Sequence, residues 1–180
     1  MADAISLDLV VATIARYGVR RTSMTDVARA LGMSRQSLYN RFGSKPALIA
    51  WAQGSLVDRS LAEALASINQ PAKTLPARLV DALDAWVGRH RHALDASPHG
   101  AEIVLVLQPD PPDTVRASER KLVAAMAEAI RLSGPGSAVP RAGSIAQALC
   151  WTARGLVHAL PDHAAFRRQM DHIAGALVAR

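Results

Sequence analysis

Cysteine and aromatic residues are scarce in this chain. Cys150 is its one cysteine, and three Trp, two Tyr and two Phe make up an aromatic content of 4%. A single cysteine excludes an intrachain disulfide and a thiolate zinc cluster, and it is typical of proteins from a reducing compartment. The sequence also lacks a run of 18 uncharged apolar residues, and its first six residues lack the basic segment of a secretory signal. We therefore expect a cytoplasmic protein that does not span a membrane.

The patterns that mark common active sites are missing as well. There is no Gly-rich phosphate loop, no G-x-S-x-G elbow, no H-E-x-x-H pair and no cluster of carboxylates, and Cys150 has no histidine within its own helical turn. His90 and His92 are two residues apart, so on a helix they point to different sides and do not converge on one ion. We expect neither catalysis nor a bound metal or cofactor.

Hydrophobic residues make up 50% of the 180 residues, which is enough for a sizeable buried core. Apolar residues recur at helical spacing along most of the chain, and Gly, Pro and Asn separate the periodic stretches. The pattern predicts an all-α protein of about nine helices with two domains, residues 1–48 and 49–180. The expected helices span residues 3–17, 24–31, 35–41, 45–68, 75–94, 101–108, 115–130, 140–160 and 162–179. Residues 101–108 fit a buried strand equally well by periodicity, and we assign a helix because the rest of the chain is helical.

Positive charge is concentrated near the N-terminus. The chain carries a formal charge of +6, and residues 1–45 hold seven Lys or Arg against three Asp, a net charge of +4. A quarter of the chain thus holds two thirds of the excess, which favours contact with a polyanion by this segment over a uniformly basic surface.

Residues 23–45 have the pattern of a helix-turn-helix. Gly32 separates two short apolar stripes, and Ser23 and Ser34 stand where the two helices begin, since a serine side chain accepts hydrogen bonds from free backbone N–H groups there. Ser44 repeats the signal for a third helix. A small shared core is expected from the apolar residues of these helices, Ala28, Leu31, Leu38 and Phe42.

The run T-S-M-T-D-V-A-R-A-L-G-M-S-R-Q-S-L-Y-N-R-F-G-S-K-P-A-L, residues 22–48, resembles the DNA-binding signature of the TetR family of bacterial regulators. With Gly18 the resemblance covers residues 4–52; beyond that it is architectural. It implies a homodimer in which the third helix of each subunit enters a major groove of a double-stranded DNA operator. It also implies a dimer interface made by the last two helices and a C-terminal cavity for a small-molecule effector.

The start of the third helix is where base contacts are expected. Residues on the first turn of a recognition helix reach base edges, and Arg35 and Gln36 have the donor patterns that pair with guanine and adenine. We predict base contacts for Arg35, Gln36 and Ser37, against the alternative that they are solvated polar residues. Phosphate or flanking contacts are expected from Ser23, Thr25, Tyr39, Asn40, Arg41 and Lys45. Tyr39 is included because of the resemblance, and a capping role alone also explains Ser23.

Two further sets of residues follow in the C-terminal half. Bulky or polar side chains on otherwise apolar helix faces are candidates to line the implied cavity, although core packing explains each of them as well: Trp86, His90, Met126, Trp151 and Thr152. The apolar positions of the last two helices are assigned to the implied dimer interface: Ile145, Leu149, Leu156, Phe166, Met170 and Ile173. The sequence thus predicts a DNA-binding regulator, by family tendency a repressor released by a ligand. The alternative is a DNA-binding regulator or architectural protein without a ligand.

Overall fold

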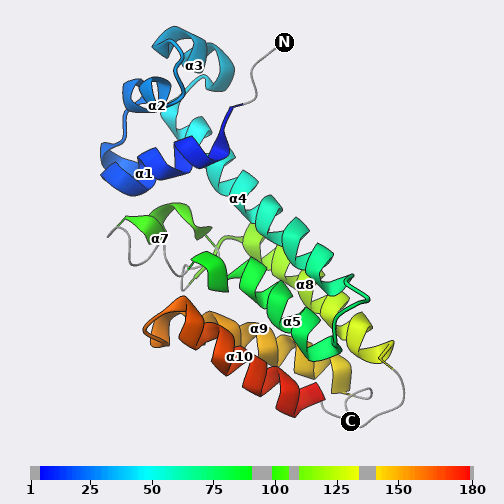
Figure 1. Cartoon of the computed structure of the whole chain (residues 1–180). Helices are drawn as coiled ribbons and strands as arrows, with labels where there is room; N and C mark the ends of the chain where they lie inside the picture. The colour runs from blue at the N-terminus through cyan, green and yellow to red at the C-terminus, as the bar shows by residue number, and fades with distance from the viewer. Residues whose placement is uncertain (1–4, 91–98, 106–109, 134–140, 179–180) are drawn as a thin grey trace. The chain divides into compact units, whose positions relative to one another are not determined.

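The computed structural model describes residues 5–90, 99–105, 110–133 and 141–178. Over these residues every regular element is a helix (Figure 1), which confirms the predicted all-α fold. The elements in chain order are α1 (Leu7–Arg21), α2 (Met24–Ala30), α3 (Arg35–Phe42), α4 (Lys45–Ile68), α5 (Leu75–Trp86), the 3-10 turn η1 (Gly88–His90), α7 (Gly100–Ile103), α8 (Asp113–Arg131), α9 (Ala142–Ala159) and α10 (His163–Val178).

The chain divides into two compact units. The first comprises residues 1–57 and 93–108, and the second comprises residues 58–92 and 109–180. The first unit is larger than the predicted segment 1–48 for two reasons. The opening turns of α4 pack onto it, with the Trp51 ring 5.1 Å from that of Phe42, and α7 packs against α1.

Serine caps define the helix starts of the first unit. The Ser23 hydroxyl accepts a hydrogen bond from the Asp26 N–H while the Asp26 carboxylate accepts one from the Ser23 N–H, a reciprocal capping box at the start of α2. Ser34 caps α3 by accepting from the Ser37 N–H at 3.0 Å. Ser44 accepts from the Ala47 N–H in the first turn of α4. All three predicted caps are confirmed.

Glycines with positive φ supply the turns. Gly32, with φ of 67°, follows α2 and allows the Met33 N–H to reach the Ala28 carbonyl. Gly18, with φ of 80° and ψ of 153°, interrupts α1 near its end. It was predicted to stop the helix, and the structure adds one more short turn that runs through Arg21 before α2 begins. These two turns set the direction in which α2 and α3 leave α1.

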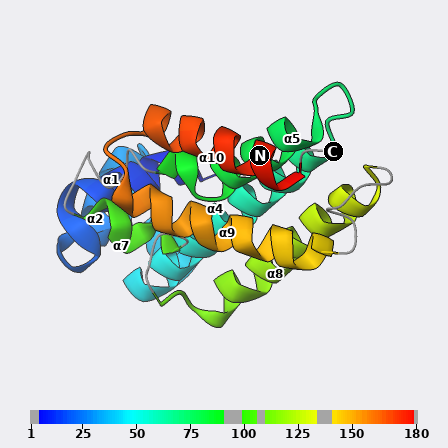
Figure 2. The same ribbon diagram turned by 90° about the horizontal axis from the view of Figure 1, so that it is seen from below.

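The second unit is a layered helical core. α8 packs against α9, and α10 packs against both α9 and α5 (Figures 1 and 2). Its largest fully buried side chains are Leu79, Leu83, Trp86, Leu122, Met126, Ile130 and Phe166. The helices found here agree with the predicted ranges except at α5, which ends at Trp86 instead of continuing to residue 94. The chain then turns through η1, and Leu94 lies outside the described residues.

The ambiguous segment 101–108 is helical only at its start. α7 covers Gly100–Ile103 and ends at Val104, whose φ is −92° and ψ is 85°; residues 106–108 lie outside the described part of the chain. His92 falls outside it as well.

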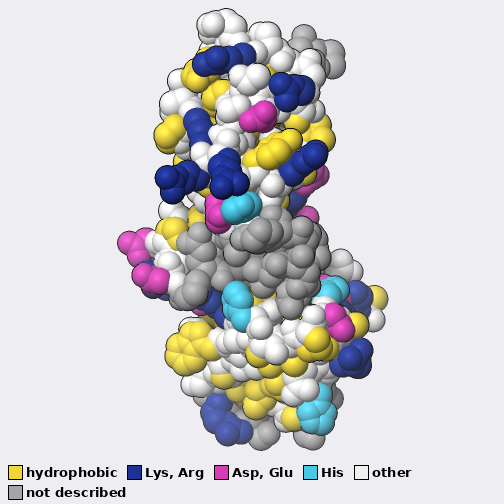
Figure 3. Space-filling view, turned by 90° about the vertical axis from the view of Figure 1, so that its left-hand side faces the viewer, with side chains coloured by type: hydrophobic (Ala, Val, Ile, Leu, Met, Phe, Trp, Pro, Cys, Tyr) yellow, Lys and Arg dark blue, Asp and Glu magenta, His cyan; other side chains and the backbone are white. Residues whose placement is uncertain are grey.

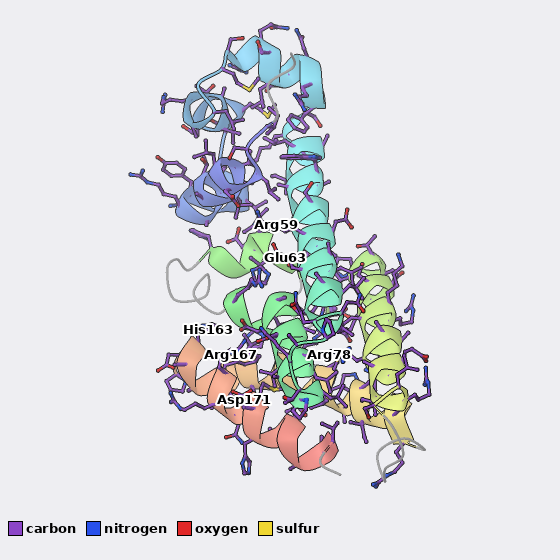
Figure 4. All side chains as sticks on the ribbon, turned by 45° about the vertical axis from the view of Figure 1, so that its right-hand side comes forward. Arg59, Glu63, Arg78, His163, Arg167 and Asp171 are labelled. Carbon is purple, nitrogen blue, oxygen red and sulfur yellow. The ribbon has the colours of Figure 1, made fainter. Side chains whose placement is uncertain are left out.

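Ion pairs join α10 to α5 along one edge of this unit (Figure 4). Arg167 contacts both Asp81, at 2.8 Å, and Asp84, at 3.2 Å, and the His163 ring lies 2.6 Å from Asp84. Partial burial acts to raise the pKa of Asp81, but hydrogen bonds from Lys73 and Arg167 outweigh it and lower the pKa below its usual value. The carboxylate therefore stays charged and holds the start of α10 against α5.

We expect Gly88→Ala to destabilise this unit. A Cβ at Gly88 would collide with the fully buried Phe166 ring and with the Asp84 carboxylate, and overpacking of this kind costs about 1–3 kcal/mol. Gly54→Ala is the control, because a Cβ there meets nothing within 4 Å and alanine in a helix interior gains about 0.5–1 kcal/mol. Thermal unfolding followed by circular dichroism measures both; an unchanged midpoint for Gly88→Ala would contradict the packing described here.

Candidate nucleic-acid interface

The first turn of α3 presents polar side chains to solvent. Arg35, Gln36 and Ser37 are exposed, while Leu38 is fully buried and fixes the rotation of the helix. The Ser34 cap closes this turn, and its hydroxyl also lies 2.8 Å from the Ser37 hydroxyl. The three residues predicted to contact bases therefore share one exposed, capped helix end.

The second turn of α3 supports the first. The Gln36 side-chain amide donates to the Asn40 amide oxygen at 2.9 Å, and the Arg35 guanidinium lies 5.2 Å from the centre of the Tyr39 ring, a cation–π distance. Both contacts restrict the rotamers of the outer side chains. Asn40 and Arg41 are exposed on the same turn, as predicted for flanking contacts.

A surface depression of about 390 Å³ adjoins α3 and brings most of the predicted phosphate contacts together. Its lining residues are Arg20, Arg21, Thr22, Ser23, Met24, Thr25, Arg35, Tyr39 and Lys45. Figure 3 shows Lys and Arg side chains gathered over the part of the molecule formed by α1 to α3. Arg20 and Arg21 were not assigned from sequence, although two consecutive arginines in the last turn before the Ser23 cap were a usable signal. A concave surface with four cations suits a phosphate backbone.

Two of the predicted phosphate ligands also have structural partners. The Lys45 ammonium donates to the Arg20 carbonyl at 2.8 Å, so it joins the start of α4 to the end of α1 while keeping two further donors. The Ser23 hydroxyl donates to the Asp26 carboxylate at 2.6 Å and has no hydrogen left for a phosphate. This hydrogen bond, followed by the one from the Ser23 N–H, lowers the pKa of Asp26. The geometry favours the capping role for Ser23, whereas Thr25 is exposed.

Comparison with known proteins agrees with this architecture. The model of the family described as bacterial regulatory proteins, tetR family, matches residues 7–51, which span α1 to the first turns of α4. Over these residues the chain is similar to bacterial regulatory proteins of the tetR family. No curated protein matches the sequence.

Solved structures of TetR-family and other regulators share the fold over nearly the whole chain. A TetR-like transcriptional regulator from Rhodococcus sp. RHA1 is 22% identical, with 97% of this chain and 94% of that chain covered and a TM-score of 0.64. A transcriptional regulator from Cytophaga hutchinsonii is 19% identical, with 96% and 94% covered and a TM-score of 0.67. The TetR family repressor AlkX from Dietzia sp. is 18% identical, with 97% of each chain covered and a TM-score of 0.54.

The residues assigned to an effector cavity occupy different surroundings in the structure. Trp151 is 67% exposed on α9, so its assignment to a cavity wall is wrong. Trp86 and Met126 are fully buried in the core of the second unit, and Thr152 is half-buried. His90 is buried, and its Nε2 lies 2.9 Å from the Ser60 hydroxyl.

The dimer assignment of three residues needs correction. Leu149, Phe166 and Met170 have no exposed surface, because they fill the core between α9, α10 and their neighbours within one subunit. Ile145 is buried too, at 7% exposure, while Leu156 and Ile173 are half-buried. Apolar periodicity identified the face of each helix that packs inside its own subunit. Among the residues that the structure describes, no helix is long and apolar enough to cross a membrane.

Replacing Arg35 or Gln36 by alanine should weaken binding to the cognate operator about tenfold to a hundredfold, the usual cost of one bidentate base contact. Binding to random DNA should weaken much less, since those side chains contribute specificity and the phosphate contacts remain. Fluorescence anisotropy with cognate and scrambled duplexes measures both. An equal loss of affinity for the two DNAs would contradict direct base readout by these residues.

Arg21→Ala should weaken cognate and random DNA alike and make the slope of log K against log salt shallower by about one. The matched control is Arg131→Ala, which removes the same charge from an exposed arginine of the second unit that pairs with Glu128. A salt slope as steep as that of the unmodified protein would exclude a phosphate contact by Arg21.

Proposed function

We propose that this protein is a homodimeric transcriptional repressor that binds a palindromic DNA operator and is released from it by a small-molecule effector. The observation that carries the DNA-binding part is the basic depression of about 390 Å³ beside the exposed first turn of α3. Arg20, Arg21 and Lys45 there supply phosphate contacts, while Arg35 and Gln36 supply base contacts. A capped helix end with base-contacting donors, beside phosphate-contacting donors of α1 and α4, fits a helix-turn-helix in a major groove.

An exposed stripe on α9 supports dimerisation. Trp151 lies at its centre with 67% of its surface exposed, and Ala148 and Gly155, three residues before and four after it, are exposed as well. A large exposed aromatic with small neighbours on the same helix face marks a protein contact, and tryptophan is common among the residues that dominate such interfaces. We place the subunit interface on this stripe and on the exposed face of α10, in place of the buried residues Leu149, Phe166 and Met170.

Buried polar groups of the second unit support an effector. Trp86 is 1% exposed, and its indole N–H is the one buried side-chain donor without a hydrogen-bond partner among the described residues. Such a group costs about 1–3 kcal/mol unless something accepts its hydrogen. Ser60 and His90 form a second buried polar pair in this unit. A ligand with a hydrogen-bond acceptor on an otherwise apolar body suits this environment. Repression is the activity that the name of the AlkX relative states.

Selection of bound duplexes from random DNA tests this function. A repressor with two copies of α3 should enrich an inverted repeat whose half-sites are one or more helical turns apart, about 34–36 Å per turn. The enriched duplex is then used to screen metabolites for loss of binding, with Trp86→Phe as a variant that lacks the indole donor. Recovery of no common sequence would sink the operator proposal. An inverted repeat with no responding metabolite would favour the regulator without a ligand.

Trp151→Glu should convert the dimer to monomers at micromolar concentration, because truncating or charging a central aromatic weakens an interface about a hundredfold. The control is Leu132→Glu, which charges another exposed apolar residue of the second unit, 77% exposed at the end of α8. Size-exclusion chromatography with light scattering gives the mass. A dimeric Trp151→Glu protein would place the interface elsewhere, and Phe166→Asp is unsuitable because it would disrupt the core.

A further inference from the structure

A side chain of α7 binds the backbone at the end of α1. The Glu102 carboxylate accepts a hydrogen bond from the Val19 N–H at 2.9 Å, across 83 residues of sequence, and its other oxygen lies 2.6 Å from Nδ1 of His99. The Glu102 carbonyl in turn accepts from the Gln53 side chain of α4 at 3.0 Å. These contacts all lie within the first unit, and none of them has a role in the interface described so far.

The carboxylate of Glu102 accepts from a backbone N–H that the turn at Gly18 leaves without a helical acceptor. The positive φ at Gly18 takes the Val19 N–H out of the helical hydrogen-bond series, and Glu102 supplies the acceptor. The His99 ring covers the same turn, because a Cβ at Gly18 would lie 2.9 Å from two of its atoms. Hydrogen bonds from His99 and then from Val19 lower the pKa of Glu102, so it is ionised near neutral pH and the bond to Val19 is charge-assisted.

The segment that Glu102 holds is the one that carries the arginines of the basic depression. Arg20 and Arg21 follow Val19 directly, and the Arg20 carbonyl is the acceptor for Lys45. Thr22 returns to the Gly18 carbonyl through both its N–H and its hydroxyl. Residues 18–22 are thus fixed by Lys45 at one point and by Glu102 at another. Arg20, Arg21 and Glu102 also line a common depression of about 620 Å³.

We propose that Glu102 is a positioning residue for DNA binding, which sets the turn at Val19 so that Arg20 and Arg21 meet the phosphate backbone. This inference rests on the proposed DNA-binding function. The expected change in DNA affinity on removing Glu102 is opposite to what its charge alone predicts. A carboxylate beside a phosphate-binding surface repels DNA, so removing its charge alone would strengthen binding. If Glu102 positions Arg20 and Arg21, loss of its hydrogen-bond acceptor weakens DNA binding instead.

Two substitutions at Glu102 separate charge from geometry. Glu102→Gln removes the charge but keeps an acceptor for the Val19 N–H, and Glu102→Ala removes both. We expect Glu102→Ala to bind the selected operator about tenfold more weakly than the unmodified protein, with a salt slope shallower by about one to two. Glu102→Gln should bind at least as tightly as the unmodified protein, with an unchanged slope.

A double-substitution background tests whether Glu102 acts through the arginines. In Arg20→Ala/Arg21→Ala protein, adding Glu102→Ala should change affinity less than twofold, because the side chains that it positions are gone. A general loss of folding would reduce binding equally in both backgrounds. Hydrogen exchange of the Val19 amide provides the direct measurement, and it should be fast in Glu102→Ala and slow in Glu102→Gln.

The outcomes are distinct. If the unmodified protein binds no DNA, the proposed function fails, whatever Glu102 does. If it binds DNA and both Glu102 variants bind more tightly, Glu102 acts only as a charge and the inference is overturned. If Glu102→Ala does not fold, Gln53→Ala takes its place, since it frees the α7 backbone and leaves the Glu102 carboxylate intact. It should weaken binding severalfold with a shallower salt slope; unchanged affinity and slope would overturn the inference.

Discussion

The turn with positive φ at Gly18 is the constraint on which the first unit depends. A residue with φ of 80° inside α1 gives the chain the direction in which the capped helices α2 and α3 follow, and it excludes a Cβ from a place that the His99 ring occupies. The turn also exposes backbone groups that need partners. Glu102 and Lys45 provide them. The backbone conformation at Gly18 therefore determines which side chains, distant in sequence, this unit requires.

Local sequence signals predicted the helices and turns of this architecture. The serine caps, the Gly32 turn and the helical periodicity each act within a few residues, and the structure confirms the helices that they predicted. Contacts between segments far apart in sequence leave no such pattern. The hydrogen bond from Val19 to Glu102 spans 83 residues, and no local sequence pattern near either residue predicted it. The first unit accordingly contains residues 93–108, which the sequence assigned to the other domain.

Periodicity also has a limit of a different kind. It shows which side of a helix is apolar but not whether that side faces its own subunit or a partner, which is why Leu149, Phe166 and Met170 were assigned to an interface although they are fully buried. Trp151 lies on the exposed side of α9 among small residues, where an aromatic residue has no packing reason within the subunit. An apolar residue out of phase with the core is the sequence signal on which the proposed interface rests.

In the proposed interface, the hydrogen bond between Gln36 and Asn40 links two neighbouring side chains of α3. The Gln36 amide uses one N–H donor in its bond to Asn40. The hydrogen-bond donors and acceptors that remain for a base therefore depend on both residues. A substitution at either position changes the pattern that the other presents. Under the proposed base contact by Gln36, operator preference at this position therefore depends on the pair of side chains and not on Gln36 alone.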